Sequence, residues 1–126
     1  MDEKKHHQLN DLEPYKVAFN LSNYVWSRVD LWGHFAKNTV GIQFTTAIDS
    51  VSANIAEGFG RYNKKDKIKF YRYARGSVFE CYDWNEKSRI RKLLSQEEYE
   101  QAFAVLQKLP KLINGLIKLT NDNLKD

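Results

Sequence analysis

Two stretches decide the fold of this chain: Ser52-Ala53-Asn54-Ile55-Ala56-Glu57-Gly58-Phe59-Gly60-Arg61 and, downstream, Tyr73-Ala74-Arg75-Gly76-Ser77-Val78-Phe79-Glu80. Apolar residues recur in both at the spacing of an α-helix. A turn containing Gly58 and Gly60 separates the two helical patterns. Because glycine enters the left-handed backbone region without steric cost, it commonly ends helices. The two stretches therefore predict two helices that meet at a glycine turn.

Polar side chains interrupt the apolar residues of these stretches, namely Asn54, Glu57, Arg75, Ser77 and Glu80. A buried polar group without a partner costs about 1–3 kcal/mol, so the group marks either a structural network or a site. Glu57 and Glu80 would suit a carboxylate pair of the di-iron type, but such sites also use Glu-x-x-His motifs, which the chain lacks. We therefore predict a structural polar network between the two helices, of the kind that fixes register and partner choice.

Helical spacing continues through most of the chain and predicts helices over about Glu13–Trp32, Asn38 or Thr39 to Glu57, Asn63–Leu94, and from Ser95 to about Thr120. Asn63 is suited to cap the helix 63–94, and Ser95 with Glu98 forms the sequence pattern of a capping box. Pro110 falls inside the last pattern, which resumes in phase, so we expect a kink there.

Long amphipathic helices with short connections predict an all-α fold, an antiparallel up-down four-helix bundle. At 126 residues the chain fits a single domain, and we assign 1–126 to it with 1–12 as a flexible tail.

The helix 63–94 carries more apolar surface than one buried face requires. Its expected inward stripe is Phe70, Ala74, Ser77, Cys81 and Trp84. A second stripe consists of Ile68, Tyr71, Phe79 and Tyr82. Either a wide core absorbs this stripe or another copy of the chain covers it, and we predict self-association through it.

Positive charge is concentrated in one segment, although the net charge of the chain is only +4. Residues 61–92 hold 11 Lys and Arg against 4 Asp and Glu, a balance of +7. Cations interleaved with aromatic side chains suit a nucleic-acid backbone with stacked bases, whereas a solvated helix face is the alternative. The predicted RNA- or DNA-binding residues are Arg61, Lys64, Lys65, Lys69 and Arg72.

No catalytic constellation is present in the sequence. Cys81 is the sole cysteine and is expected to be buried, while His6, His7 and His34 have no metal-ligand partner at helical spacing. We therefore expect no enzyme activity, no cofactor and no metal, and a metal-dependent enzyme is the third and least favoured function. The polar N-terminus and the lack of a long apolar run predict a cytoplasmic protein without a membrane segment.

The runs Asn54-Ile55-Ala56-Glu57-Gly58 and Tyr73-Ala74-Arg75-Gly76-Ser77, with Glu80 downstream, resemble the bacterial four-helix-bundle proteins encoded within intervening sequences of 23S ribosomal RNA genes. The resemblance extends from about Leu12 to Leu119. It implies a ring-like homopentamer. It also implies a relationship to the accessory variability determinant of diversity-generating retroelements, which engages a reverse transcriptase and nucleic acid.

The chain departs from the family pattern at two places. Thr45-Thr46 follows Gln43-Phe44 where the family often carries an Arg-Arg pair, and Ser52 stands where a proline is common. Nucleic-acid binding must therefore rely on the helix 63–94. We predict a non-enzymatic homo-oligomer that binds RNA or DNA, and the alternative is an adaptor that binds a protein, such as a reverse transcriptase, without nucleic acid.

Overall fold

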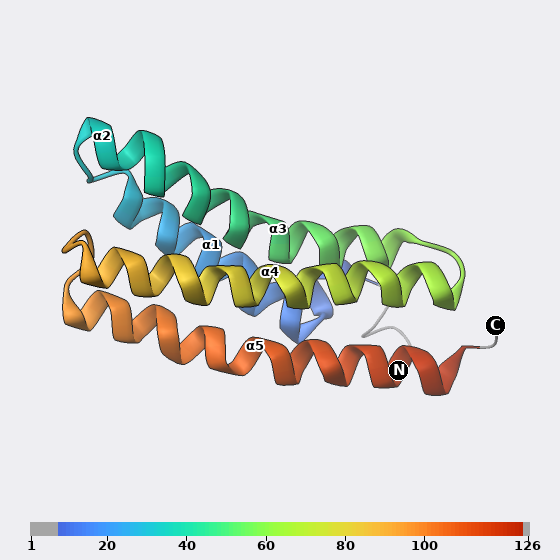
Figure 1. Ribbon diagram of the computed structural model, residues 1–126. Helices are drawn as coiled ribbons and strands as arrows, with labels where there is room; N and C mark the ends of the chain where they lie inside the picture. Colours follow the sequence, from blue (N-terminus) through green and yellow to red (C-terminus); the bar gives the residue numbers. More distant parts are fainter. Residues whose placement is uncertain (1–7, 125–126) are drawn as a thin grey trace.

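The computed structural model describes residues 8–124, in which every regular element is helical (Figure 1). In chain order they are a 3-10 helix η2 (Leu9–Asp11), α1 (Glu13–Val29), α2 (His34–Ala36), a π-helical turn η3 (Lys37–Gly41), α3 (Ile42–Gly60), α4 (Lys64–Ile90) and α5 (Gln96–Asn123).

The four long helices α1, α3, α4 and α5 pack antiparallel, and residues 8–124 contain no strand, which confirms the predicted fold class. Helix α3 lies against both α1 and α4, and α5 closes the bundle against α4 and α1. None of the helices in this part of the chain has both the length and the apolar character needed to span a membrane.

The buried positions of α4 and α5, which form the core seam of each helix, follow a heptad repeat. The buried positions in the body of α4 are spaced alternately three and four residues apart: Tyr71, Ala74, Val78, Cys81, Asn85 and Ser88. The same alternation runs along α5 through Ala102, Leu106, Leu109, Ile113, Leu116 and Thr120. A repeat of 3.5 residues keeps one seam facing the partner helices when they supercoil left-handedly.

The seam of α4 differs from the predicted inward stripe. Ala74 and Cys81 are buried as expected, but Phe70, Ser77 and Trp84 are only half-buried, on the flank toward α3. Burial raises the pKa of the Cys81 thiol, with smaller contributions from the nearby carboxylates of Glu80 and Asp49. A thiol held in its neutral form is a poor nucleophile.

The last residues of the predicted N-terminal tail pack against the core. Leu12 is buried in the core and Leu9 packs against it, so the predicted tail 1–12 is too long at its C-terminal end. The reason is that the apolar side chains of Leu9 and Leu12 pack against the core just before α1 begins. The remainder of the predicted tail, with His6 and His7, lies outside the described residues.

The predicted helix starts at Asn63 and Ser95 are confirmed. The Asn63 side chain accepts a hydrogen bond from the Asp66 N–H, and Ser95 and Glu98 form the complete capping box. Other ends differ: α1 stops at Val29, and helical backbone resumes at His34, before the expected Asn38. Pro110 does not break α5, which is helical from Gln96 to Asn123.

Gly58 and Gly60 belong to α3 and have ordinary negative φ angles, so they do not form a left-handed turn. Gly58 instead permits close packing against α4. A Cβ atom at Gly58 would lie 2.6 Å from Tyr71 Cε1 and 2.9 Å from the Lys67 carbonyl oxygen. Tyr71 is only 2% exposed, and burial raises its pKa to about 12.

We expect Gly58→Ala to lower the free energy of unfolding by about 1–3 kcal/mol, because the new methyl group overpacks the contact with Tyr71. Gly115→Ala is the matched control, since Gly115 is inside a helix with no atom within 4 Å of its added Cβ. The control should gain roughly 0.5–1 kcal/mol from helix propensity. Urea denaturation measures both, and a neutral Gly58→Ala would contradict the close approach.

Glu98 links the start of α5 to α1. Its carboxylate accepts a hydrogen bond from the Ser95 N–H at 2.9 Å and pairs with Arg28 Nη1 at 2.9 Å. The Ser95 main-chain hydrogen bond, and then the Arg28 guanidinium, hold the pKa of Glu98 below its ordinary value of 4.5. A lowered pKa in the folded state stabilises the fold at neutral pH, and this contribution is lost as the pH falls below 4.5.

Glu98→Gln should lower stability at pH 7 by about 0.5–1 kcal/mol, since glutamine can keep the capping hydrogen bond but not the charge. The difference from the parent should shrink as the pH falls from 4.5 toward 3, because the parent then loses the charge of Glu98 by protonation. Glu97→Gln, in the same helical turn, controls for the loss of an acidic side chain near a helix N-terminus. Thermal denaturation at both pH values tests this, and an equal deficit at pH 3 would refute it.

Candidate nucleic-acid interface

The N-terminal half of α4 exposes a group of basic side chains. Lys65, Lys69 and Arg72 are all exposed, and with Asp66 and Tyr73 they line one surface depression of about 390 Å³. The N-cap of Asn63 fixes the first turn of α4 and with it the direction of these side chains. The structure therefore brings together three of the five predicted nucleic-acid-binding residues.

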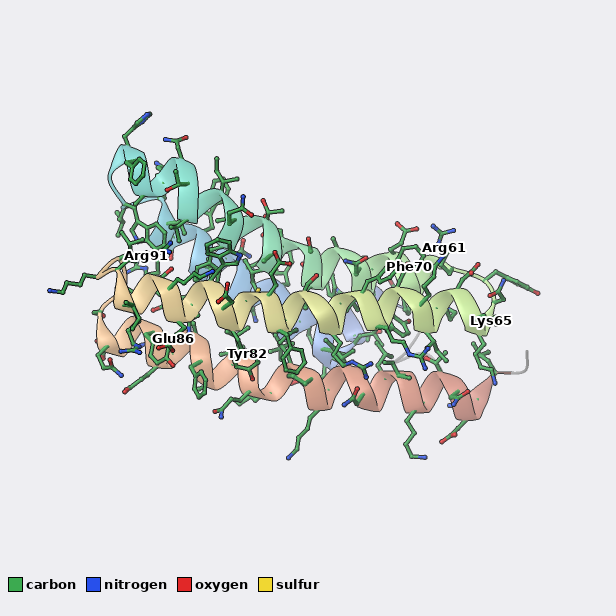
Figure 2. The ribbon with its side chains drawn as sticks, viewed as in Figure 1. Arg61, Lys65, Phe70, Tyr82, Glu86 and Arg91 are labelled. Atoms are coloured by element: carbon green, nitrogen blue, oxygen red, sulfur yellow. The ribbon has the colours of Figure 1, made fainter. Side chains whose placement is uncertain are left out.

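Arg61 lies on the other side of α4. Its guanidinium pairs with Glu57 at 2.7 Å and stacks over the Phe70 ring, 4.7 Å from the ring centroid. Figure 2 shows Arg61 and Phe70 on the side of α4 nearest α3, whereas Lys65 extends toward the end of α5. Lys69 Nζ also approaches Phe70, at 5.3 Å, so this ring carries cations from both sides of the helix start. The predicted nucleic-acid-binding residues are thus spread over two sides of α4.

Two basic side chains in this segment stabilise helix ends. Lys64 is half-buried and donates from Nζ to the Asn121 carbonyl at 3.3 Å, near the end of α5. Lys67 donates to the carbonyls of Phe59 at 2.8 Å and Gly58 at 3.4 Å, which closes the C-terminus of α3. Desolvation lowers the pKa of Lys67. Lys64, one of the five predicted residues, is therefore engaged within the fold.

The predicted polar network does not form within the described chain. Asn54 donates to the Ser50 carbonyl of its own helix at 2.8 Å, and Glu57 is occupied by Arg61. Arg75 donates to Asn114 Oδ1 at 2.5 Å, on α5 rather than α3. The remaining members differ in exposure: Glu80 is exposed and Ser77 half-buried. The physical reason is the heptad seam of α4, which places all of these α4 side chains on its flanks.

The predicted oligomer interface also divides. Ile68 and Tyr71 are 8% and 2% exposed, so the core of the single chain already covers them. Phe79 remains 58% exposed, and Tyr82 is half-buried with its ring 5.7 Å from that of Phe79. Two further rings of this surface were not predicted from the sequence. Tyr82 also contacts Phe103 on α5, and Phe103 stacks on Tyr99. We call Phe79, Tyr82, Phe103 and Tyr99 the aromatic ladder.

The ladder ends in a charged cluster. Tyr99 donates from its hydroxyl to Glu86 Oε1 at 2.9 Å, and Glu86 also pairs with Arg89, whose guanidinium stacks over Tyr99 at 5.1 Å. Hydrogen bonds from Arg89 and then Tyr99 lower the pKa of Glu86. Figure 2 shows Tyr82 and Glu86 on the side of α4 that faces α5. This surface therefore combines aromatic area with paired charges.

Metal-binding geometry is likewise lacking in the described part of the chain. No three His, Cys, Asp or Glu side chains within residues 8–124 gather closely enough to hold a metal ion. His34 is exposed, and its Nδ1 lies 3.2 Å from the Asn38 amide of the next turn.

Fold and surface together define a class of protein: an antiparallel four-helix bundle with a heptad core and a basic, aromatic surface at one end of α4. Within that class, residues 10–115 match the model of the 23S rRNA-intervening sequence protein family. The chain belongs to that family.

A solved structure supports the fold. A protein of unknown function from the S23 ribosomal protein family of Bacteroides thetaiotaomicron superposes with a TM-score of 0.74 and 19% sequence identity. The superposition covers 83% of this chain and 98% of the other. No curated protein is significantly similar to this chain.

Proposed function

We propose that the protein binds the phosphate backbone of RNA or DNA through the N-terminal half of α4, without catalysing a reaction. The observation that carries the proposal is the convergence of Lys65, Lys69 and Arg72 beside Tyr73 in one depression. Asp66 is the sole acidic residue lining it. A cationic groove bordered by an aromatic ring is the arrangement that tracks a nucleic-acid backbone and stacks an unpaired base.

The neighbouring aromatic side chains fit this role. Tyr62 is 96% exposed in the turn before α4, and Tyr73 packs edge-to-face on Phe70 with the ring centroids 5.6 Å apart. The face of Phe70 is already used by Arg61, so Tyr62 and Tyr73 are the rings available for stacking. Three or four phosphate contacts from one chain give weak, salt-sensitive binding.

Self-association would strengthen such weak binding. We propose that copies of the chain assemble through the aromatic ladder, where Phe79 keeps most of its ring in water. The family resemblance implies a homopentamer, and repeating the basic depression around a closed ring raises avidity without any new contact. Arg72 stands seven residues before Phe79, so these two side chains lie along the same side of α4.

Lys65→Glu, Lys69→Glu and Arg72→Glu in one variant should abolish most RNA affinity, because the substitutions replace phosphate-binding cations with repelling charges. The measurement is fluorescence anisotropy of a labelled single-stranded RNA across a salt series. For the parent, log K should fall linearly with log salt, and the variant should lose roughly 2 from that slope, about 0.7 per phosphate contact.

The matched control reverses Lys108, Lys111 and Lys118 on α5, which changes net charge by the same amount away from the depression. Equal losses in both variants would mean that net charge alone attracts RNA. An unchanged affinity in the α4 variant would remove the depression as the binding site and favour the protein-binding adaptor.

Phe79→Asp should convert the assembly to monomers, because an exposed aromatic contact becomes a desolvated carboxylate at the interface. Light scattering during size-exclusion chromatography measures the mass directly. Tyr73→Asp, an exposed aromatic residue on the other flank of α4, is the control and should leave the mass unchanged. A parent protein that is monomeric at micromolar concentration would contradict the assembly itself.

A further inference from the structure

A second surface lies at the opposite end of α4 from the basic depression. A cleft of about 840 Å³ opens between the segment α2–η3–α3 and the end of α4. Phe35, Thr39 and Gln43 line one wall, and Trp84 and Arg91 line the other. Figure 1 shows α2 and the start of α3 rising away from α4 at this end, and Figure 2 places Arg91 there.

The divergence of the helices has a packing cause. At its C-terminal end α3 is held against α4 by the close approach of Gly58 to Tyr71. At its N-terminal end it is held against α1 instead, since a Cβ at Gly41 would lie 2.7 Å from Val29 Cγ1. Gly41 ends the π-helical turn Lys37–Gly41, and such turns frequently occur at functional sites. The cleft is therefore built into the fold by two glycine contacts.

Exposed apolar side chains gather at this end of the bundle. Phe35 is 81% exposed, and four more large apolar residues at this end have over half of their surface in water: Trp26, Leu31, Ile42 and Ile90. Trp26 and Ile42 also line a smaller depression of about 200 Å³ on the other side of the π-helical turn. Of these residues, Phe35 and Ile42 line the cleft itself, and exposed apolar side chains gathered at one end of a bundle suit an interaction site.

The charge around the cleft selects its partner. No acidic residue lines it, and Arg91 forms no ion pair within residues 8–124. Lys92 follows, exposed and with a positive φ of 62°. Lys87 lies over the Trp84 ring at 4.6 Å and pairs with Asp83 at 2.7 Å, which adds a cation beside this wall. A partner with carboxylates complements this rim.

The walls also restrict the backbone of the partner. Apart from Arg91 and Leu93, the lining residues lie in helices whose main-chain groups are hydrogen-bonded internally, so the cleft offers few backbone donors or acceptors to an extended peptide. A ligand that pairs its own backbone groups avoids that cost. We propose that the cleft binds an amphipathic helix of a partner protein, with its apolar face against Phe35 and Trp84 and its carboxylates toward Arg91.

The test uses two fluorescein-labelled peptides of about 18 residues, roughly five helical turns, with the same leucine- and phenylalanine-rich face. One carries glutamate along the polar flanks and the other carries lysine. In anisotropy titrations of the full chain, the acidic peptide should bind at least about tenfold more tightly than the basic peptide.

Three variants test the cleft itself. Arg91→Glu should remove the preference for the acidic peptide. Gln43→Trp, at an exposed position in the cleft wall, should weaken binding of the acidic peptide because the larger side chain obstructs the cleft. Lys108→Glu, the same charge reversal on α5, should leave it unchanged.

Several results would overturn the proposal. They are an acidic peptide that fails to bind at millimolar protein, equal binding of the two peptides, or an Arg91→Glu variant indistinguishable from the parent. A second copy of the chain is the other possible occupant, and light scattering distinguishes it. If Gln43→Trp dissociates an assembly of the chain, the cleft holds a second copy and the proposal of a partner helix is wrong. Because the experiment uses no nucleic acid, a negative result would not bear on the proposal that the basic depression of α4 binds nucleic acid.

Discussion

The heptad seam is the constraint on which the other features of this molecule depend. In α4 and α5 the buried positions alternate between three and four residues, so each helix must keep one narrow line toward the bundle axis. Every other side chain of α4 is then assigned to the flank facing α3, the flank facing α5, or the outer surface. Phe70 and Trp84 lie on the first flank, Arg75 and Tyr82 on the second, and Lys69 on the outer surface. The positions of the basic depression, the aromatic ladder and the cleft all follow from this assignment.

Local signals allowed much of the fold to be predicted, because the groups involved are neighbours in sequence. Ser95 and Glu98 satisfy each other across one turn, so their pattern predicts a helix start independently of packing. The phase of α4 was harder to predict. Phe70, Ser77 and Trp84 are spaced by seven residues, and so are Tyr71, Val78 and Asn85. Hydrophobicity favours the first series, yet the second is buried, with Asn85 fully enclosed and donating to the Tyr99 carbonyl at 3.2 Å.

The candidate site was only partly predictable, since a count of charged residues does not tell which side chains form hydrogen bonds within the fold. Lys64 and Lys67 belong to the basic segment, but both donate to carbonyls at helix ends, which must be satisfied somewhere. The polar residues near Gly58 failed as a network for a related reason. Apolar neighbours in sequence do not imply burial in space, and on an exposed flank the nearest partner of Glu57 is Arg61, four residues away. The π-helical turn has no sequence signal of comparable strength.

Helix α4 also sets the distance between the two proposed surfaces. Its 27 residues span roughly 40 Å at the usual rise per residue, with the basic depression near the first turns and the cleft at the last turns. A nucleic acid on the first surface and a partner helix on the second would therefore not compete for space. Since one continuous helix joins them and Lys92 ends it with a left-handed residue, their separation is fixed by the backbone rather than by a linker. A rigid spacing of this kind would hold the two proposed ligands at a defined distance from each other.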